Sequence, residues 1–198
     1  MKMRKDNRRY DGEADVFSLD YEGRGVARVD GKALFIEGAM PGERVRFEII
    51  RSKKQFDEAR VIDIIRYSEN RVKPKCRHFD TCGGCSIQHI DSTAQIAFKQ
   101  RIMEEQLERI GKIRPEQILP AIYGTPWHYR DRARLSISKD AGGRLKIGFK
   151  AKKSHDVIDV DSCMVLPAHI SEKLPKIKQM LQRDRKSTRL NSSHLELS

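Results

Sequence analysis

Apolar and polar residues alternate with a period of two over residues 13–67, which is typical of β-strands. The clearest run would place Val45, Phe47 and Ile49 on one side of a strand and charged residues on the other. Glycine-containing turns separate the runs, and the Asp-Gly pair at 30–31 is a hairpin signal. Four or five short strands in about 55 residues favour a small closed barrel, because closure removes exposed strand edges.

A helical period follows over residues 92–111, where apolar residues recur three, four and seven positions apart. The sequence STAQ from Ser92 to Gln95 is a capping-box pattern and predicts the start of the helix. Gly111 predicts its end. The apolar stripe consists of Ile96, Met103, Leu107 and Ile110.

A second β region begins near residue 133, where two runs of period two are joined by the turn sequence DAGG. Its inward-facing residues are expected to be Leu135, Ile137, Leu145, Ile147 and Phe149. A third strand within 156–166 would carry Cys163, and a last helix would run from Pro167 or Ala168 to about Gln182. The sequence therefore predicts an α+β fold, in which a barrel at 13–67 precedes an α+β domain at 68–183.

The two ends of the chain differ from the part between them. Residues 1–12 are polar and basic and are expected to form a loose arm. Residues 184–198 have neither a helix cap nor an apolar face, and they resemble the translated read-through of a sequencing adapter. We therefore expect this tail not to be native sequence, the alternative being a genuine disordered tail.

The composition is strongly basic, with 40 Lys and Arg against 28 Asp and Glu, a net charge of +12. Such a balance favours a polyanionic partner, nucleic acid before an anionic membrane. No apolar run approaches the roughly 18 residues that a membrane span needs, and no apolar segment follows the basic start as in a secretory signal. The expected location is cytoplasmic, where clustered cysteines indicate metal or redox chemistry rather than disulfides.

Three of the four cysteines lie within ten positions, with five residues between the first two and two residues between the next pair. Thiolates favour iron–sulfur clusters, zinc or copper(I). Zinc ribbons use two matched pairs, so the five-residue gap suits them poorly, whereas an iron–sulfur cube accepts three local thiolates and a distant one. Two alternatives remain open: His78 or His89 completes a zinc site, or the cysteines are reduced and structural. The four cysteines are Cys76, Cys82, Cys85 and Cys163.

The positive charge is concentrated between residues 130 and 153, which hold nine Lys or Arg residues and two acids. Strand alternation would place most of these cations on one surface, as phosphate binding requires. Trp127 and Tyr129 lie just upstream as candidates for stacking on unpaired bases. The alternative is that both aromatics belong to the core and that the cations form an ordinary wet surface. The candidate RNA-binding residues are Arg130, Arg132, Arg134, Arg144, Lys146, Lys150, Trp127 and Tyr129.

These segments together resemble a known family. EGRGVARVDGKALFIEGAMPGERV resembles a TRAM domain, a small RNA-binding barrel. CRHFDTCGGCSIQH, WHYRDRARL and DSCMVL resemble the bacterial enzymes that methylate uracil C5 in RNA, and the TRAM domain points to the type that acts on 23S ribosomal RNA. The resemblance covers about residues 10–183. Asp131 departs from it, since the family often has Asn after the Tyr-Arg pair.

The resemblance implies that the four cysteines hold a [4Fe–4S] cluster, which shapes an RNA-binding surface because uracil methylation needs no electron transfer. The implied partner is ribosomal RNA, and no membrane is involved.

The family's reaction needs a cysteine that adds to uracil C6, S-adenosylmethionine as methyl donor, and a carboxylate base. A doubly wound domain with a glycine-rich turn holds the methyl donor. The chain shows neither this domain nor a cysteine outside the cluster set, so no catalytic or S-adenosylmethionine-binding residue is assigned. We expect an N-terminal fragment that is inactive by itself, monomeric, and with part of its helical apolar stripe exposed. Alternatives are a non-catalytic RNA-binding module stapled by zinc or an iron–sulfur cluster, and a redox sensor.

Overall fold

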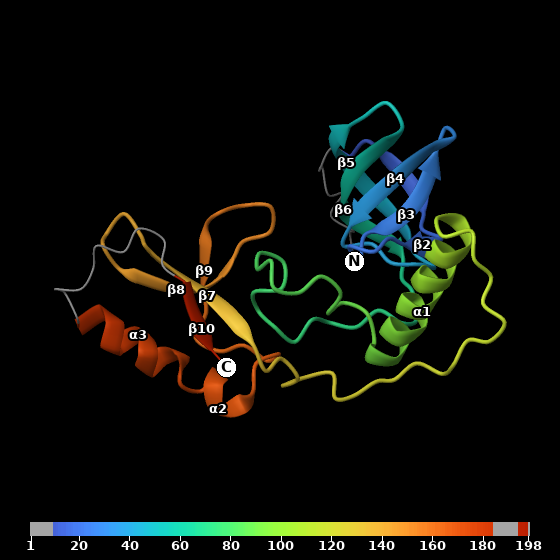
Figure 1. The fold of residues 1–198 in the computed structure, drawn as a ribbon. Helices are drawn as coiled ribbons and strands as arrows, with labels where there is room; N and C mark the ends of the chain where they lie inside the picture. Colours follow the sequence, from blue (N-terminus) through green and yellow to red (C-terminus); the bar gives the residue numbers. More distant parts are fainter. Residues whose placement is uncertain (1–9, 184–193, 198) are drawn as a thin grey trace, which may run out of the picture. The chain divides into compact units, whose positions relative to one another are not determined.

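The computed structural model describes residues 10–183 and 194–197, and the chain divides into two compact units (Figure 1). The first contains the residues up to Lys73 together with His89–Ala121. The second contains Pro74–Gln88 and the residues from Ile122 onward. The helix expected at 92–111 thus lies in the same unit as the barrel, whereas the sequence placed it in the second domain. Most of the expected basic arm, residues 1–9, lies outside the described residues.

The first unit contains a six-stranded sheet, one strand more than the sequence predicted. Its order is β1-β5-β6-β4-β3-β2, and β4 and β6 are its parallel neighbours. Between β1 and β2 the chain passes from one edge of the sheet to the other. The Val16 amide donates to the carbonyl of Glu43, just before β5, and the Phe17 amide donates to the carbonyl of Val26 in β3. The strands are β1 (Gly12–Asp15), β2 (Ser18–Leu19), β3 (Gly25–Val29), β4 (Lys32–Glu37), β5 (Arg44–Ser52) and β6 (Phe56–Arg66).

The barrel core follows the predicted alternation. Val45 and Phe47 are buried, whereas Ile49, which the pattern placed on the same face, is exposed near the end of β5. The predicted hairpin between β3 and β4 is confirmed, since Asp30 and Gly31 both have positive φ, at 50° and 78°. Two left-handed residues in succession match the twist of the paired strands.

Helix α1 (Ser92–Arg109) begins differently from the prediction, but it ends at the C-cap Ile110, directly before Gly111 as predicted. Its N-cap is Asp91, whose carboxylate accepts from the Thr93 amide at 2.9 Å, so the capping box at Ser92 was wrong. At the other end Lys112 adopts the left-handed conformation, with φ 54°. Two residues of the predicted apolar stripe are exposed, Met103 at 45% and Ile110 at 79%.

The second unit is a four-stranded antiparallel sheet in the order β10-β7-β8-β9, with two helices. Helix α3 contacts β8, and its Lys178 side chain forms an ion pair with Asp159. The buried core residues are Leu135, Ile137, Leu145, Ile147, Val160, Leu166 and Leu174. The elements are β7 (Ala133–Lys139), β8 (Leu145–Lys150), β9 (Val157–Asp159), α2 (Ala168–Ser171), α3 (Leu174–Arg183) and β10 (His194–Leu197).

Two features of this unit differ from the prediction. The third strand ends at Asp159, so Cys163 lies in the following loop and not in a strand. The last helix is interrupted between α2 and α3. Residues 194–197 of the expected non-native tail pair with β7, while 184–193 and 198 lie outside the described residues. Within the described part of the chain no helix is long and apolar enough to span a membrane.

Candidate metal centre and nucleic-acid interface

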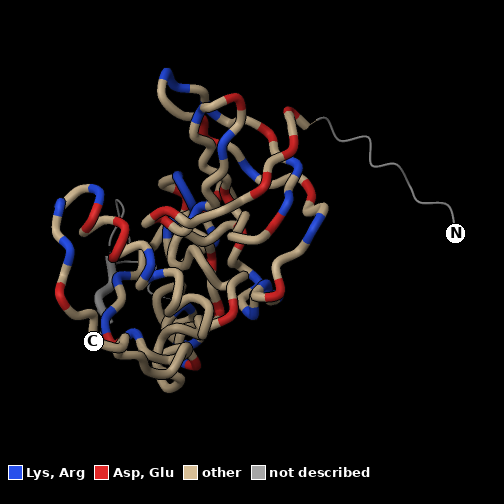
Figure 2. The backbone as a smooth tube through the Cα atoms, turned by 90° about the vertical axis from the view of Figure 1, so that its right-hand side faces the viewer, with Lys and Arg blue, Asp and Glu red and all other residues tan. Residues whose placement is uncertain are grey.

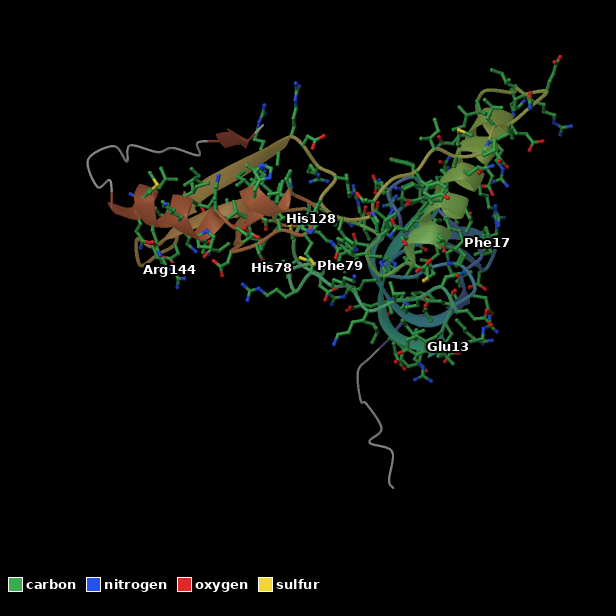
Figure 3. All side chains as sticks on the ribbon, turned by 90° about the horizontal axis from the view of Figure 1, so that it is seen from below. Glu13, Phe17, His78, Phe79, His128 and Arg144 are labelled. Carbon is green, nitrogen blue, oxygen red and sulfur yellow. The ribbon has the colours of Figure 1, made fainter. Side chains whose placement is uncertain are left out.

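All four cysteines line one pocket in the second unit, which encloses about 400 Å³ including space open to solvent. Cys76, Cys82 and Cys85 lie in the loop that precedes α1, and Cys163 lies in the loop after β9. None of the four forms a disulfide. His78 and Phe79, both labelled in Figure 3, also line the pocket. The structure thus brings together the residues that the spacing singled out.

The cysteine loop is held in a tight fold by its own backbone and by the end of β8. The Phe79 amide donates to the Cys76 carbonyl at 3.1 Å, and the Cys82 amide to the His78 carbonyl at 2.7 Å. The Gly83 amide donates to the Lys150 carbonyl at 2.9 Å. A Cβ atom on Gly83 would stand 2.9 Å from that same carbonyl oxygen, so only glycine allows this approach.

A separate network positions the Cys163 loop. The Cys163 amide donates to the Ser171 hydroxyl at 2.8 Å, which ties the cysteine to helix α2. Residues 128–130 run beside the loop, because the His128 amide donates to the Met164 carbonyl and the Arg130 amide to the Val165 carbonyl, each at 2.9 Å.

Burial and mutual proximity disfavour thiolates among the four cysteines of the pocket. Burial raises the pKa of Cys82, the Gly84 amide opposes this effect, and the other three cysteines add to it. Burial likewise raises the pKa of Cys163, against the amides of Val165 and Leu166. Thiols in such surroundings become thiolates when a cation is bound beside them.

The donor set fits a soft metal centre held by four sulfurs. Among residues 10–183 and 194–197, no group of three or more His, Cys, Asp or Glu side chains is arranged to coordinate a single metal ion. Of the two histidines considered for a zinc site, His78 lines the pocket. His89 is buried in the other unit and does not line it.

The predicted basic face lies on the β7–β8 hairpin. Leu135, Ile137, Leu145 and Ile147 are buried, as the alternation predicted, and Phe149 packs against them. Ser136 is buried as well, although it was expected on the outer face. The cations of the outer face are exposed at Arg132, Arg134, Arg144 and Lys150 and half-buried at Lys146 (Figure 3 labels Arg144).

The two candidate stacking residues have different surroundings. Trp127 is half-buried, and the Lys75 ammonium lies 5.4 Å from its ring centroid. Tyr129 is 53% exposed. Arg130, which was predicted to contact RNA, lines the cysteine pocket and donates to the Gly84 carbonyl at 3.2 Å. The charge count along the sequence did not reveal this placement, because it depends on the contact between residues 46 positions apart.

The barrel carries no excess of positive charge. Residues 10–66 hold ten Lys or Arg and twelve Asp or Glu, and both signs of charge are mixed along the backbone trace (Figure 2). Many of the cations form ion pairs within the unit: Arg24 with Asp20, Lys32 with Asp57, Arg46 with Glu13, and Arg60 with Glu48. The charge that makes the whole chain basic therefore lies elsewhere.

Comparison with known proteins first shows which class of protein this chain is similar to. Residues 12–62 match the TRAM domain family. A solved structure of similar fold is the Pyrococcus abyssi tRNA (uracil-54, C5)-methyltransferase in complex with S-adenosyl-L-homocysteine. The two share 25% identity at a TM-score of 0.60, and the match covers 86% of this chain and 37% of that one.

Curated relatives narrow the class further. The chain is 60% identical over 169 residues to the 23S rRNA (uracil(1939)-C(5))-methyltransferase RlmD of Neisseria lactamica, and 50% identical to that of Azoarcus sp.. Each match covers 85% of this chain, which spans 37% and 39% of the two relatives. The predicted resemblance to TRAM-containing RNA uracil-C5 methyltransferases is thereby confirmed.

Proposed function

We propose that this chain is the RNA-binding and metal-holding part of an S-adenosylmethionine-dependent enzyme that methylates uracil C5 in 23S ribosomal RNA. The observation that carries the proposal is the 60% identity to a curated 23S rRNA (uracil-C5)-methyltransferase over most of the chain. A match that covers 85% of the chain must span both the cysteine loop and the basic hairpin.

In this proposal Cys76, Cys82, Cys85 and Cys163 hold a [4Fe–4S] cluster. The support is that four soft donors line one pocket and that the fourth comes from a distant loop. When bound, the cluster supplies a cross-link between the two cysteine loops. One of these loops is bonded to the end of β8 and the other to the backbone of residues 128–130, so the cross-link would fix both ends of the basic hairpin.

RNA contact is assigned to the outer face of that hairpin. Arg132, Arg134, Arg144, Lys146 and Lys150 lie there over a buried apolar layer, which gives phosphates a rigid positive surface. Tyr129 is the better placed of the two aromatics for stacking on a base, because the Lys75 ammonium lies against the Trp127 ring.

None of the described residues is assigned the chemical step. All four cysteines of the chain line the pocket, so none is proposed as the nucleophile that adds to uracil. The chain spans less than two fifths of the relatives, and we expect it to bind RNA without methylating it.

Anaerobic reconstitution with iron and sulfide tests the metal centre. We expect about four iron and four sulfide per chain and a broad absorbance near 400 nm. Cys163→Ser should lose most of the iron, while His78→Ala should keep it. Stoichiometric zinc that depends on His78, with no iron uptake, would instead support a three-cysteine, one-histidine site.

A further inference from the structure

Arg130 holds an unusual place among the side chains that line the cysteine pocket. Of the described residues in the lining, it is the one with a permanent charge, and the lining contains no carboxylate. Its side chain is half-buried, and no ion pair with a described Asp or Glu neutralises it. A partly buried guanidinium without an anion is costly, so its placement calls for negative charge in the pocket itself.

The geometry connects Arg130 to both cysteine loops. Its amide donates to the Val165 carbonyl at 2.9 Å, two residues after Cys163. Its guanidinium Nη2 donates to the Gly84 carbonyl at 3.2 Å, between Cys82 and Cys85. Both ends of this residue are therefore fixed by the segments that carry the thiols, and its position on the pocket wall does not depend on a flexible surface rotamer.

We infer that Arg130 is the counter-cation of an anionic metal–thiolate centre in this pocket and not a contact to RNA phosphate. The inference rests on the proposed metal centre. Four thiolates around a [4Fe–4S] core leave a net negative charge, and so do four thiolates around zinc. A cation held at the wall offsets that charge and stabilises the more negative state of the centre.

Two consequences follow. Without the cation, the net negative charge of the metal–thiolate centre is no longer offset, so the centre is less stable and the metal is released faster to a chelator. The reduction of a [4Fe–4S] centre by one electron, supplied by dithionite, adds negative charge, so loss of the cation lowers the midpoint potential. Neither effect involves RNA or methyl transfer.

The experiment compares the reconstituted chain with Arg130→Met, Arg130→Gln and Arg130→Lys. Arg132→Met is the matched control, because it removes the same charge two residues away at an exposed position. Iron and sulfide content, the rate of iron loss to a chelator, and the midpoint potential are measured, with far-UV circular dichroism as a check of folding. We expect several-fold faster iron loss and a more negative potential in Arg130→Met and Arg130→Gln. Arg130→Lys should lie between them and the parent, and Arg132→Met should equal the parent.

The outcomes separate the inference from the proposal on which it rests. An iron-loaded Arg130→Met or Arg130→Gln with the parental potential and release rate overturns the role of Arg130 and leaves the cluster standing. If the parent chain takes up zinc and no iron, the rate of zinc release is measured for the parent and the variants in place of the rate of iron loss. A parent that binds neither metal refutes the metal centre and the inference together. The Gln variant serves if the Met variant does not fold.

Discussion

Glu43 is fully buried in the barrel unit, and its partners are all nearby donors of the same unit. Arg71 forms a forked pair with both carboxylate oxygens, and the Met40 amide donates to Oε2 at 3.1 Å. The same Nη2 of Arg71 that donates to Oε2 also donates to the Gly38 carbonyl. The pair thus binds the segment after β6 to the turn between β4 and β5, and its removal would leave a buried group without its partner.

Replacing Arg71 by Met tests this pair. The carboxylate of Glu43 would stay buried without its cation, and we expect a loss of about 3 kcal/mol in the stability of the barrel. Hydrogen exchange of the amides of β5 and β6 measures this loss. The double variant Arg71→Met with Glu43→Gln should recover part of it, because no buried charge remains. Equal losses in the single and double variants would show that the charge pair is not the cause.

The ion pair of Asp159 with Lys178 makes the second unit sensitive to acid. Burial acts to raise the pKa of Asp159, but the Lys178 ammonium and the Ile147 amide outweigh it and lower the pKa below the usual 3.8. A carboxyl with a lowered folded pKa contributes stability above its unfolded pKa, and this contribution is lost as the pH falls through the folded value.

Asp159→Asn should therefore destabilise the second unit at neutral pH, and the difference from the parent should shrink as the pH falls below about 4. The fluorescence of Trp127, the chain's one tryptophan, reports on this unit during urea unfolding. Glu172→Gln, at an exposed position on the same unit, should show no such pH-dependent difference. A gap between Asp159→Asn and the parent that is constant with pH would contradict this account.

At the scale of elements, the strands and the hairpin could be predicted because their alternation is local in sequence. The start of α1 and the length of β9 could not. Asp91 provides the cap through a carboxylate one position before the expected motif. The apolar run after Asp159 continues in the sequence, but Val165 and Leu166 are buried from a loop rather than a strand. Periodicity does not distinguish these cases, since both bury the same residue types.

The packing of the cysteine loop against the end of β8 also belongs to the scale of elements. At Gly83 the loop backbone lies so close to β8 that it leaves no room for a side chain. Gly83→Ala would bring a Cβ within 2.9 Å of the Lys150 carbonyl oxygen, so the loop must move away from β8. We expect faster loss of iron from the reconstituted chain and lower thermal stability of the second unit. Gly124→Ala is the matched control, because nothing lies within 4 Å of its added methyl group. Parental iron retention in Gly83→Ala would show that the loop tolerates the displacement.

At the scale of the whole molecule, net charge predicted a polyanionic partner but not the unit that would bind it. The +12 of the chain is unevenly divided, since the barrel segment 10–66 has more acids than bases and 130–153 has nine bases and two acids. The resemblance to TRAM domains by itself points to the barrel as the RNA-binding part. We expect the electrostatic part of any RNA affinity to come instead from the β7–β8 hairpin of the second unit, where the excess of bases lies.

The triple variant Arg132→Met, Arg144→Met, Lys150→Met tests this division of roles. Each phosphate contact on single-stranded nucleic acid contributes about 0.7 to the slope of log affinity against log salt, so the slope should fall by about 2. Fluorescence anisotropy with a short uridine-containing RNA at several salt concentrations measures this slope.

The matched barrel variant replaces the exposed cations Arg51, Lys53 and Lys54 by Met and removes the same charge from the chain. We expect this variant to keep the parental slope, because long-range attraction between exposed charges is screened beyond about 10 Å at 0.1 M salt. If both triple variants reduced the slope equally, the affinity for RNA would depend on the total charge of the chain, and the hairpin would not be a specific binding surface.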